Sequence, residues 1–179
     1  PSASGNRRPA SSLEGVEITV IRPQDMPLQV ANGNFDLAIT GHDWVTDHKA
    51  AFPSSPIVEL ADLKFGWVKI VAVVGNDVPA NNLYELKQWC RKAEAPLRVA
   101  SEYTNLSDKY ARDNQLGMYR IIPTWGATEA FLPEDADLLI ENTETGGTIA
   151  RHNLKIIDTL FESTAHFIGA QNSKFSALK

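Results

Sequence analysis

Short apolar runs alternate with segments of helical character along most of this chain, and this alternation restricts the possible folds most strongly. The longest compact run, at residues 70–74, contains only isoleucine, alanine and valine and suits a buried strand. Strands that alternate with helices predict an α/β fold with largely parallel sheets. Strands are expected at residues 16–20, 35–40, 57–63, 67–74, 97–100, 119–122, 137–141, 154–157 and 165–168. Helices are expected at 28–31, from 42, at 82–92, 104–116 and 126–131, and near Thr148.

Length and composition set outer limits on the class of protein. The 179 residues suit one large domain or two small lobes. A hydrophobic fraction of 43% and a charged fraction of 22% exclude a disordered chain, a collagen and a disulfide scaffold. The net charge of −5 argues against a surface for nucleic acid.

Membrane attachment and secretion are not expected from the sequence. No apolar run approaches the roughly 18 residues of a membrane helix, and the first residues do not have the apolar core of a signal peptide. The single cysteine, Cys90, cannot form an internal disulfide, which fits a reducing compartment. We therefore expect a cytoplasmic protein with neither a membrane nor a nucleic acid as partner.

Residues 141–148 carry the strongest signal for a binding site. They follow a buried strand and precede a helix, and Gly146 and Gly147 let backbone N–H groups approach an anion closely. The threonines of this segment add hydroxyl donors. The carboxylate of Glu141, at the end of the strand, is placed to accept hydrogen bonds from sugar hydroxyls. The segment therefore fits a phosphate site beside a sugar-binding acid.

A plainer interpretation of the same segment stays open. The glycines can form an ordinary turn, with Thr145 or Thr148 serving only as the cap of the helix that follows. Glu144 also weakens the phosphate hypothesis, because its carboxylate repels a phosphate unless it points away.

A second strand-to-helix corner, at residues 40–43, allows two interpretations. A ligand can lie against Gly41, or the corner is a tight turn in which Asp43 stabilises the first helical turn. Nearby His42, Asp47 and His48 suggest a metal site together with Asp43, but their spacing is wrong for zinc. We therefore expect no metal site built by the protein.

The remaining reactive side chains are expected to be structural. His152 and His166 are isolated in the sequence, and lone histidines on strands are usually core or surface groups. Cys90 lies on an amphipathic helix with Leu86 and Trp89, which indicates packing rather than nucleophilic chemistry.

Several motifs occur together in the order found in one enzyme family. They are Arg-Pro-Gln-Asp-Met-Pro at 22–27, Asp-Leu-Ala-Ile-Thr-Gly-His-Asp at 36–43, Leu-Lys-Phe-Gly at 63–66, and the segments 98–106, 126–130, 141–148 and 153–154. The ordered set covers about residues 15–169. It resembles the catalytic core of ATP phosphoribosyltransferase, the first enzyme of histidine biosynthesis.

This resemblance implies a bilobal α/β fold like that of the type II periplasmic binding proteins, with two mixed, mostly parallel sheets and an interlobe cleft. The first lobe, on the nucleotide side, would hold residues 1–94 and 164–179. The second lobe, on the phosphoribosyl pyrophosphate side, would hold residues 95–163. Residues 1–5 would be the tail of the family's first turn, and the family's first helix would then be either absent or not represented.

The reaction implied by the resemblance joins adenine N1 of ATP to phosphoribosyl pyrophosphate and releases pyrophosphate. Magnesium would enter with the substrate phosphates. Glu141 would be the catalytic group and would hold the ribose hydroxyls, in a phosphoribosyl pyrophosphate site made of Glu141, Asn142, Thr143, Glu144, Thr145, Gly146, Gly147 and Thr148. The nucleotide-side candidates are Arg22, Gly41, Asp43, Phe65, Gly66, Tyr103 and Glu129.

The chain departs from the family pattern at two positions of this loop. Glu141 stands where the family usually has aspartate, and Glu144 stands where it usually has a small residue. The first change keeps the carboxylate, whereas the second places a negative group beside the phosphate site. A form that binds nucleotide without turnover therefore stays open, as does a non-catalytic sensor domain of the same fold.

The resemblance also implies partners. The chain looks like the family's short form or a trimmed catalytic core, because it does not contain the C-terminal regulatory domain of the long form. The short form works with a separate subunit that resembles histidyl-tRNA synthetase. A homo-oligomer that binds ATP and phosphoribosyl pyrophosphate is therefore expected.

Overall fold

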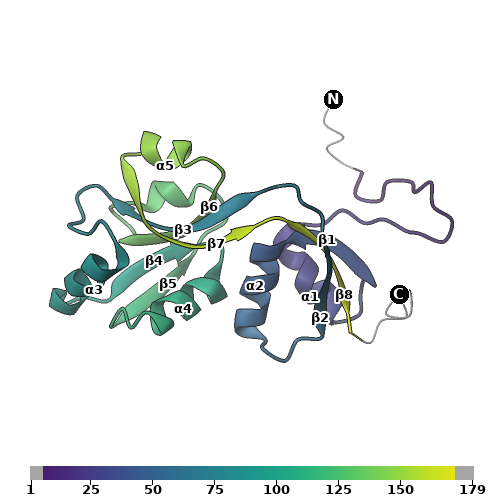
Figure 1. The fold of residues 1–179 in the computed structure, drawn as a ribbon, viewed down its shortest axis with the longest axis horizontal. Coiled ribbons are helices and arrows are strands. Elements are labelled where there is room, and N and C mark those ends of the chain that lie inside the picture. The colour runs from purple at the N-terminus through teal and green to yellow at the C-terminus, as the bar shows by residue number, and fades with distance from the viewer. Residues whose placement is uncertain (1–5, 172–179) are drawn as a thin grey trace.

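The computed structural model describes residues 6–171, which form two lobes joined by two passages of extended chain (Figure 1). The suggested turn at residues 1–5 lies outside the described residues, as does the segment 172–179 of the expected first lobe. The helices among residues 6–171 include none long and apolar enough to cross a membrane.

The first lobe is built on a three-stranded sheet in the order β1-β8-β2. Strands β1 (Leu37–Gly41) and β2 (Ile57–Asp62) both run antiparallel to the central β8 (Ala165–Ala170). A short 3-10 turn η1 (Pro23–Asp25) leads into α1 (Met26–Ala31), and α2 (His42–Ala51) follows β1 directly. The helices cover the sheet through a small core of Val30, Val45, Ile57 and Ile168.

The second lobe is built on a five-stranded sheet in the order β5-β4-β6-β3-β7. Its strands are β3 (Val68–Gly75), β4 (Leu97–Ser101), β5 (Tyr119–Pro123), β6 (Leu138–Thr143) and β7 (Leu154–Ser163). Its helices are α3 (Leu83–Lys92), α4 (Thr104–Asp113), the 3-10 turn η2 (Thr128–Phe131) and α5 (Gly147–Arg151).

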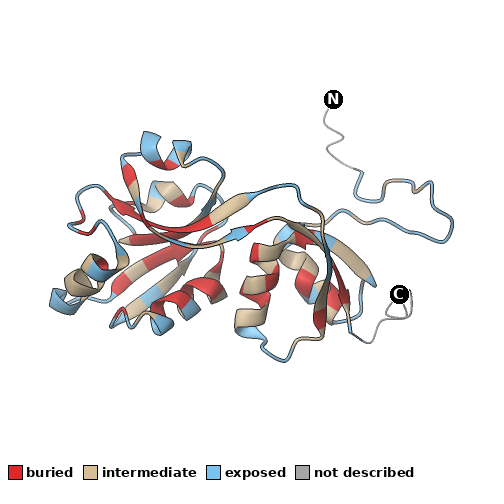
Figure 2. Ribbon diagram, viewed as in Figure 1, coloured by how far each residue is buried: buried red, intermediate tan, exposed pale blue. Residues whose placement is uncertain are grey.

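Strand β3 lies between β6 and β7 in this sheet, and the expectation of a buried strand at 70–74 is confirmed. All five of these side chains have no exposed surface (Figure 2). Ile70, Ala72 and Val74 join one core cluster, whereas Val71 and Val73 join a second cluster with Ile149. Because successive side chains of a strand point to opposite faces, the sheet is covered on both faces, as an apolar run without alternation requires.

The α/β architecture with two sheets is as expected and the larger sheet is mixed, but the sheets are less parallel than the alternation of elements suggested. The pairings of β4 with β5 and with β6 are parallel. The pairings of β8 with β1 and β2, and of β3 with β6 and β7, are antiparallel. Parallel neighbouring strands need a crossover connection, usually a helix. No such helix follows β2, because the short segment 63–67 carries the chain directly to β3 in the other sheet.

The boundary between the sheets also differs from the expected lobe boundary near residue 94. Strand β3 pairs with β6 and β7 of the larger sheet, and Leu86 of α3 packs in the core of that same lobe. The chain therefore crosses at 63–67 and returns at Thr164. The apolar pattern of β3 indicates burial but not which strands it joins, so the pattern alone does not reveal this crossing.

The strand expected at 16–20 is wrong. Val16, Ile18 and Val20 are 45%, 41% and 51% exposed, and this extended segment joins neither sheet. Its backbone hydrogen bonds go to loop residues, from the N–H of Val16 to the carbonyl of Leu13 at 3.3 Å and from the N–H of Val20 to the carbonyl of Arg7 at 2.8 Å. Alternation of apolar and polar residues describes a strand only where a neighbouring strand pairs with it.

Candidate functional site

The parallel part of the larger sheet brings three loops to one edge. Because β4, β5 and β6 run in the same direction, their carboxyl ends lie together. Glu102 follows β4, Glu129 follows β5, and Glu141 lies in the last half of β6. Ligands of open α/β sheets bind at this edge.

These loops enclose a hollow of about 240 Å³. Every residue that lines it belongs to the second lobe: Val73, Glu102, Gly126, Ala127, Glu129, Leu139, Glu141, Asn142, Thr148, Ile149 and Leu154. The floor is apolar where Val73, Leu139 and Ile149 meet in the core, and the rim carries the carboxylates. A small apolar floor with a few convergent polar groups is the usual form of a small-molecule site.

Two neighbouring carboxylates influence Glu141 in this hollow. Burial raises the pKa of Glu141 above its ordinary value, and the neighbouring Glu102 and Glu129 raise it further. Hydrogen bonds from the Asn142 N–H, at 2.8 Å, and from the Thr128 side chain lower it in part. A half-buried carboxylate beside two others favours any ligand that brings positive charge or hydroxyl donors.

The loop between β6 and α5 forms the turn that its glycines predict. Gly146 adopts the left-handed conformation at φ +76°, and its N–H donates to Thr143 Oγ1 at 2.8 Å. The N–H of Gly147 faces Thr145 Oγ1 at 3.4 Å. Thr148, the second residue of α5, is exposed and lines the hollow.

A basic side chain lies beside this loop. Arg151, in the last turn of α5, donates through Nη2 to Thr148 Oγ1 at 3.3 Å and through Nε to the carbonyl of Gly147 at 3.3 Å. Glu144 is exposed and is not among the residues that line the hollow.

A hydrogen-bonded chain of side chains connects the hollow to the first lobe. The amide of Asn142 donates to Tyr103 Oη at 3.0 Å, and Tyr103 Oη donates to Asp43 Oδ2 at 2.6 Å. Ser163 Oγ donates to Asp43 Oδ1 at 2.6 Å and accepts from the Asp43 N–H at 3.0 Å. Asp43 and Tyr103 are 5% and 1% exposed, so both are occupied by this network.

A second contact between the lobes is the cap of α4. This helix has no capping side chain of its own; instead Asp47 on α2 accepts from the N–H groups of Asn105, at 3.0 Å, and Leu106, at 2.8 Å. The amide of Asn105 adds a bond of 2.8 Å to the same carboxylate. A carboxylate satisfies the free N–H groups at a helix start, so α2 of one lobe holds α4 of the other.

The other nucleotide-side candidates lie apart from this network or support it indirectly. A side chain at Gly41 would place its Cβ 2.0 Å from Asp43 Oδ1, so the glycine makes room for that carboxylate. Phe65 and Gly66 are exposed in the passage 63–67, and the carbonyl of Phe65 accepts from Ala165 at 2.9 Å. Glu129 lines the hollow with Glu141.

Arg22 is a basic candidate of the first lobe. It forms an ion pair with Asp25 at 2.9 Å, and Asp25 is the main cause of its raised pKa. Glu102 of the second lobe raises that pKa to a smaller extent. The ion pair leaves the guanidinium exposed to solvent.

Sequence reasoning did not single out three residues that the structure places here. They are Glu102, Thr128 and Arg151. Glu102 directly follows a buried strand parallel to β6, and this position was the available signal, since parallel strands end at one edge. Thr128 and Arg151 have no such signal, because their placement depends on turns whose geometry the sequence does not specify.

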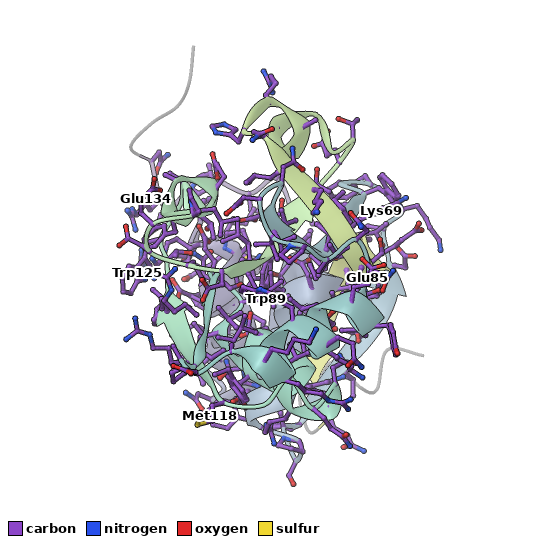
Figure 3. The ribbon with its side chains drawn as sticks, turned by 90° about the vertical axis from the view of Figure 1, so that its left-hand side faces the viewer. Lys69, Glu85, Trp89, Met118, Trp125 and Glu134 are labelled. Atoms are coloured by element: carbon purple, nitrogen blue, oxygen red, sulfur yellow. The ribbon has the colours of Figure 1, made fainter. Side chains whose placement is uncertain are left out.

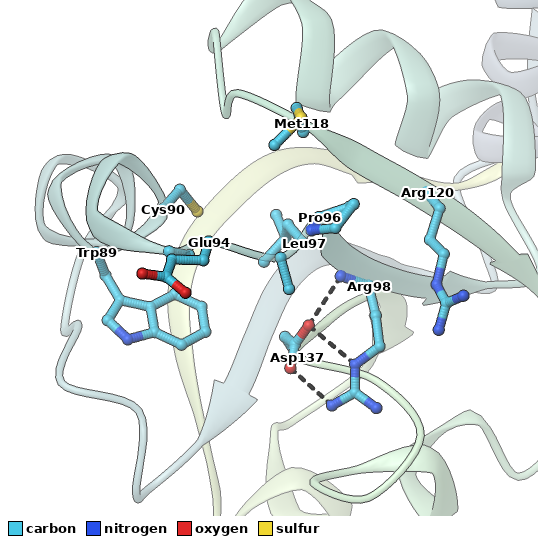
Figure 4. A pocket seen from close by; sticks show the side chains of 11 residues that line it. Trp89, Cys90, Glu94, Pro96, Leu97, Arg98, Met118, Arg120 and Asp137 are labelled. Carbon is cyan, nitrogen blue, oxygen red and sulfur yellow. Dashed lines mark hydrogen bonds and ion pairs between the residues drawn. The ribbon is translucent and has the colours of Figure 1, made fainter.

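A larger hollow of about 780 Å³ lies at the far end of the second lobe (Figure 4). Figure 3 looks onto this end and shows Trp89 near its middle and Met118 and Trp125 at its periphery. The hollow lies where β4 and β5 begin, opposite to the edge where ligands of such sheets bind. Its Arg98 is already held by Asp137, at 2.8 Å. We therefore assign the functional site to the smaller hollow.

The structure agrees with the expectation for Cys90 but not with the expectation that His166 is isolated. Cys90 packs against the core as expected, and burial raises its pKa to about 11. His166, expected to be isolated, instead lies 2.6 Å from Glu59, and His42 lies 2.6 Å from the same carboxylate. The partner of His42 is therefore on β2, not among its own helix neighbours Asp43 and Asp47.

Comparison with known proteins gives a single family. The family model described as ATP phosphoribosyltransferase matches residues 22–178. ATP phosphoribosyltransferase of Saccharolobus solfataricus is 35% identical over 170 residues, which cover 90% of this chain and 52% of that protein. The enzyme of Chlorobaculum parvum is 31% identical over 170 residues, 92% of this chain and 53% of that protein. The chain spans about half the length of these curated relatives.

Solved structures agree on the fold. The ATP phosphoribosyl transferase (HisG:HisZ) complex from Thermotoga maritima has a chain that superposes with a TM-score of 0.75 and 20% identity, covering 95% of this chain and 78% of that chain. The glutamate complex of the AvGluR1 ligand binding domain superposes with a TM-score of 0.56 and 18% identity, over 86% of this chain and 64% of that one. The bilobal binding-protein-like fold is thereby confirmed.

Proposed function

This chain belongs to the ATP phosphoribosyltransferase family, and we propose that it transfers the phosphoribosyl group of phosphoribosyl pyrophosphate to N1 of the adenine of ATP. The products are phosphoribosyl-ATP and pyrophosphate, the first step of histidine biosynthesis. The observation that supports this most is the hollow at the edge of the parallel strands, where Glu141 lies beside the glycine turn of α5.

The proposed roles follow from the contacts in this hollow. Glu141 accepts hydrogen bonds from the ribose hydroxyls, which compensate for the loss of solvation that raises its pKa. Thr145, Gly146, Gly147 and Thr148 bind the 5′-phosphate, and Arg151 adds positive charge beside Thr148. Asn142 and Thr143 hold the loop, through Tyr103 Oη and the Gly146 N–H respectively.

The chemical step is a displacement at the anomeric carbon of the ribose. The bond from this carbon to the pyrophosphate oxygen breaks, the bond to adenine N1 forms, and positive charge develops on the ring in between. The carboxylate of Glu141 near the ring stabilises that charge, and holding both substrates in line supplies much of the rate enhancement.

Magnesium enters this proposal with the phosphates of the substrate. Glu102, Glu129 and Glu141 are oxygen donors at one hollow, and Mg²⁺ prefers oxygen ligands and shares them with substrate phosphates. The carboxylates therefore suit a phosphoribosyl pyrophosphate that carries Mg²⁺ better than the bare anion, which they would repel.

The proposed position of ATP is the first-lobe side of the hollow. Arg22 is exposed there and is influenced by Glu102 across the lobes, so its guanidinium is available to phosphates. Gly41, Asp43 and Tyr103 support that side by fixing α2 against α4. Phe65 and Gly66 remain candidates for contact because both are exposed on the passage between the lobes.

The proposed assembly is a cytoplasmic homo-oligomer with a separate regulatory subunit that resembles histidyl-tRNA synthetase. The similar chain from Thermotoga maritima comes from a structure described as a HisG:HisZ complex. A sensor domain of the same fold is the rival, and likeness of fold alone does not separate the two.

The test is an assay of the natural full-length protein with ATP, phosphoribosyl pyrophosphate and Mg²⁺. The expected result is phosphoribosyl-ATP and an equal amount of pyrophosphate, with or without the regulatory subunit. Binding of both substrates with no product under either condition would identify a degenerate member or a sensor instead.

A further inference from the structure

We propose that His42, Glu59 and His166 form a binding site for a divalent transition metal ion such as Zn²⁺. The site lies in the first lobe, whereas the hollow around Glu141 is lined by the second lobe alone. It therefore does not depend on the proposed transferase activity.

The three side chains converge on one point. Glu59 Oε2 lies 2.6 Å from Nδ1 of His42 and 2.6 Å from Nδ1 of His166. One ligand atom from each of the three residues lies within 4.8 Å of the other two. Among the residues that the structure describes, no other group of three such side chains meets in this way.

A β-bulge produces this convergence. Glu59 pairs with Ile168 and Asp62 pairs with His166, and the register shifts by one residue between Glu59 and Ala61. Directly paired residues of antiparallel strands share a face, so the extra residue places both carboxylates on the same face as His166 and Ile168. Ile168 packs against Val45 of α2, so this is the face that α2 covers.

The first residue of α2 completes the group from above the sheet. The N–H of His42 donates to the carbonyl of Thr164 at 3.0 Å, which fixes the start of the helix over β8. Its ring then lies 5.1 Å from the ring of His166. Three different elements thus supply one ligand each.

Hydrogen bonding alone leaves this cluster incomplete. His42 Nδ1 makes an aligned bond to Glu59, but Nδ1 of His166 is buried without an aligned partner, although the same oxygen is only 2.6 Å away. Asp62 lies 3.7 Å from Nε2 of His166 and favours a proton on that nitrogen. Nδ1 then carries a lone pair aimed at a carboxylate, and a cation between them satisfies both.

The donor set indicates which cation fits. Two imidazoles and one carboxylate are a familiar zinc set that leaves a fourth position open. Mg²⁺ prefers oxygen ligands and should not compete. Zinc at about 2.0–2.1 Å from each ligand needs the three atoms to separate by several tenths of an ångström. The side chains of His42 and Glu59 are 36% and 22% exposed, which leaves room for this change.

One neighbouring charge opposes the metal. Lys49 Nζ lies 3.7 Å from Oε1 of Glu59, the oxygen that faces away from the histidines. Lys64 is held by Asp62, so its charge is already compensated. The Lys49→Met variant should therefore bind the ion more tightly than the wild type, which a purely accidental cluster would not predict.

The test uses metal-free protein and Zn²⁺ alone, with binding followed by competition against a chromophoric chelator. We expect one equivalent to bind, unaffected by millimolar Mg²⁺, and at least a tenfold weaker affinity in His166→Ala and in Glu59→Gln. The matched control His152→Ala, which removes an exposed histidine of the other lobe, should bind like the wild type.

Co²⁺ in place of Zn²⁺ gives a second readout, because its absorption spectrum reports a tetrahedral site with nitrogen ligands. The spectrum should appear with the wild type and disappear with His42→Ala, with circular dichroism used to establish that each variant is folded. Failure of Zn²⁺ to bind stoichiometrically would overturn the proposal, as would equal binding in the wild type and His166→Ala. Neither result would bear on the transferase assay.

Discussion

Tyr103 Oη donates a hydrogen bond of 2.6 Å to Asp43 Oδ2, and this bond joins the two lobes at their most buried point. The ring of Tyr103 also stacks on Trp44 of the first lobe, with 4.2 Å between ring centroids. Burial and the neighbouring Asp43 raise the pKa of Tyr103 well above its ordinary value, so the hydroxyl keeps its proton and remains a donor. The same hydroxyl accepts from Asn142 beside the hollow.

The Tyr103→Phe variant should therefore lose stability while it keeps its ring packing. It leaves the buried Asp43 with the Ser163 hydroxyl as its remaining side-chain donor, and we expect a loss of about 1.5–3 kcal/mol in the free energy of unfolding. Urea unfolding followed by fluorescence measures this loss. Tyr84→Phe removes a hydroxyl from a ring that is 70% exposed and should change little; equal effects of the two variants would contradict the role of the network.

The Gly146→Ala variant tests the turn before α5. Gly146 has φ +76°, and the nearest atom to an added Cβ is Ile156 Cδ1 at 3.7 Å, so the cost comes from the backbone conformation rather than from a clash. We expect a loss of about 1–2 kcal/mol in stability, with weaker binding of phosphoribosyl pyrophosphate. Gly147→Ala adds the same methyl group where the backbone is not left-handed and should cost less.

The His42–Glu59 pair predicts a pH dependence in the presence of a chelator. The hydrogen bond with Glu59 raises the pKa of His42 above 6.5, and the same bond lowers that of Glu59 below 4.5. The stabilisation that protonated His42 contributes is complete below pH 6.5 and is lost as the pH rises through the raised pKa of His42. The stabilisation that ionised Glu59 contributes is complete above pH 4.5 and is lost as the pH falls through the lowered pKa of Glu59.

Stabilisation by this pair should therefore be greatest between pH 4.5 and 6.5. His42→Gln should destabilise the protein more at about pH 5.5 than at about pH 8.5, measured as the difference in urea midpoint from the wild type. Asp43 raises the pKa of His42 and Lys49 lowers it, and both residues are present in the wild type and in the variant. The same penalty at both pH values would show that the pair is not charged.

Cys90 should react slowly with thiol reagents in the folded protein. Burial raises its pKa to about 11, so only about one thiol in a thousand is ionised at pH 8. A disulfide reagent such as 5,5′-dithiobis(2-nitrobenzoic acid) should label it far more slowly than glutathione and at the normal rate after unfolding in urea. Rapid labelling of the folded protein would place Cys90 on an exposed surface.

Elements whose evidence is local could be predicted from the sequence. Asn82 accepts from the N–H of Glu85 at 2.9 Å, so the expected cap of α3 is present. The return bond goes one residue earlier, from the Asn81 N–H to Glu85 at 2.7 Å. The helix start at His42 and the loop after β6 also follow from local glycine and strand signals.

Relationships between distant segments could not be predicted in this way. The passage at 63–67, the cap of α4 by Asp47 and the meeting of His42 with Glu59 and His166 all depend on strand order. Strand order depends on which apolar faces bury one another, and a periodic pattern specifies the face but not its partner. The bulge near Leu60 adds a further shift that alternation alone does not signal.

Calorimetric titration with Mg²⁺ and phosphoribosyl pyrophosphate tests the central claim, that Glu141 holds the ribose of this substrate. Glu141→Gln keeps the shape of the side chain, and Glu134→Gln makes the same change at an exposed position that Figure 3 shows at the periphery of the lobe. We expect the wild type and Glu134→Gln to bind equally, and Glu141→Gln to bind at least tenfold more weakly, since a lost charged hydrogen bond costs about 1.5–3 kcal/mol. Equal affinity of Glu141→Gln and the wild type would contradict the account and move the sugar site elsewhere.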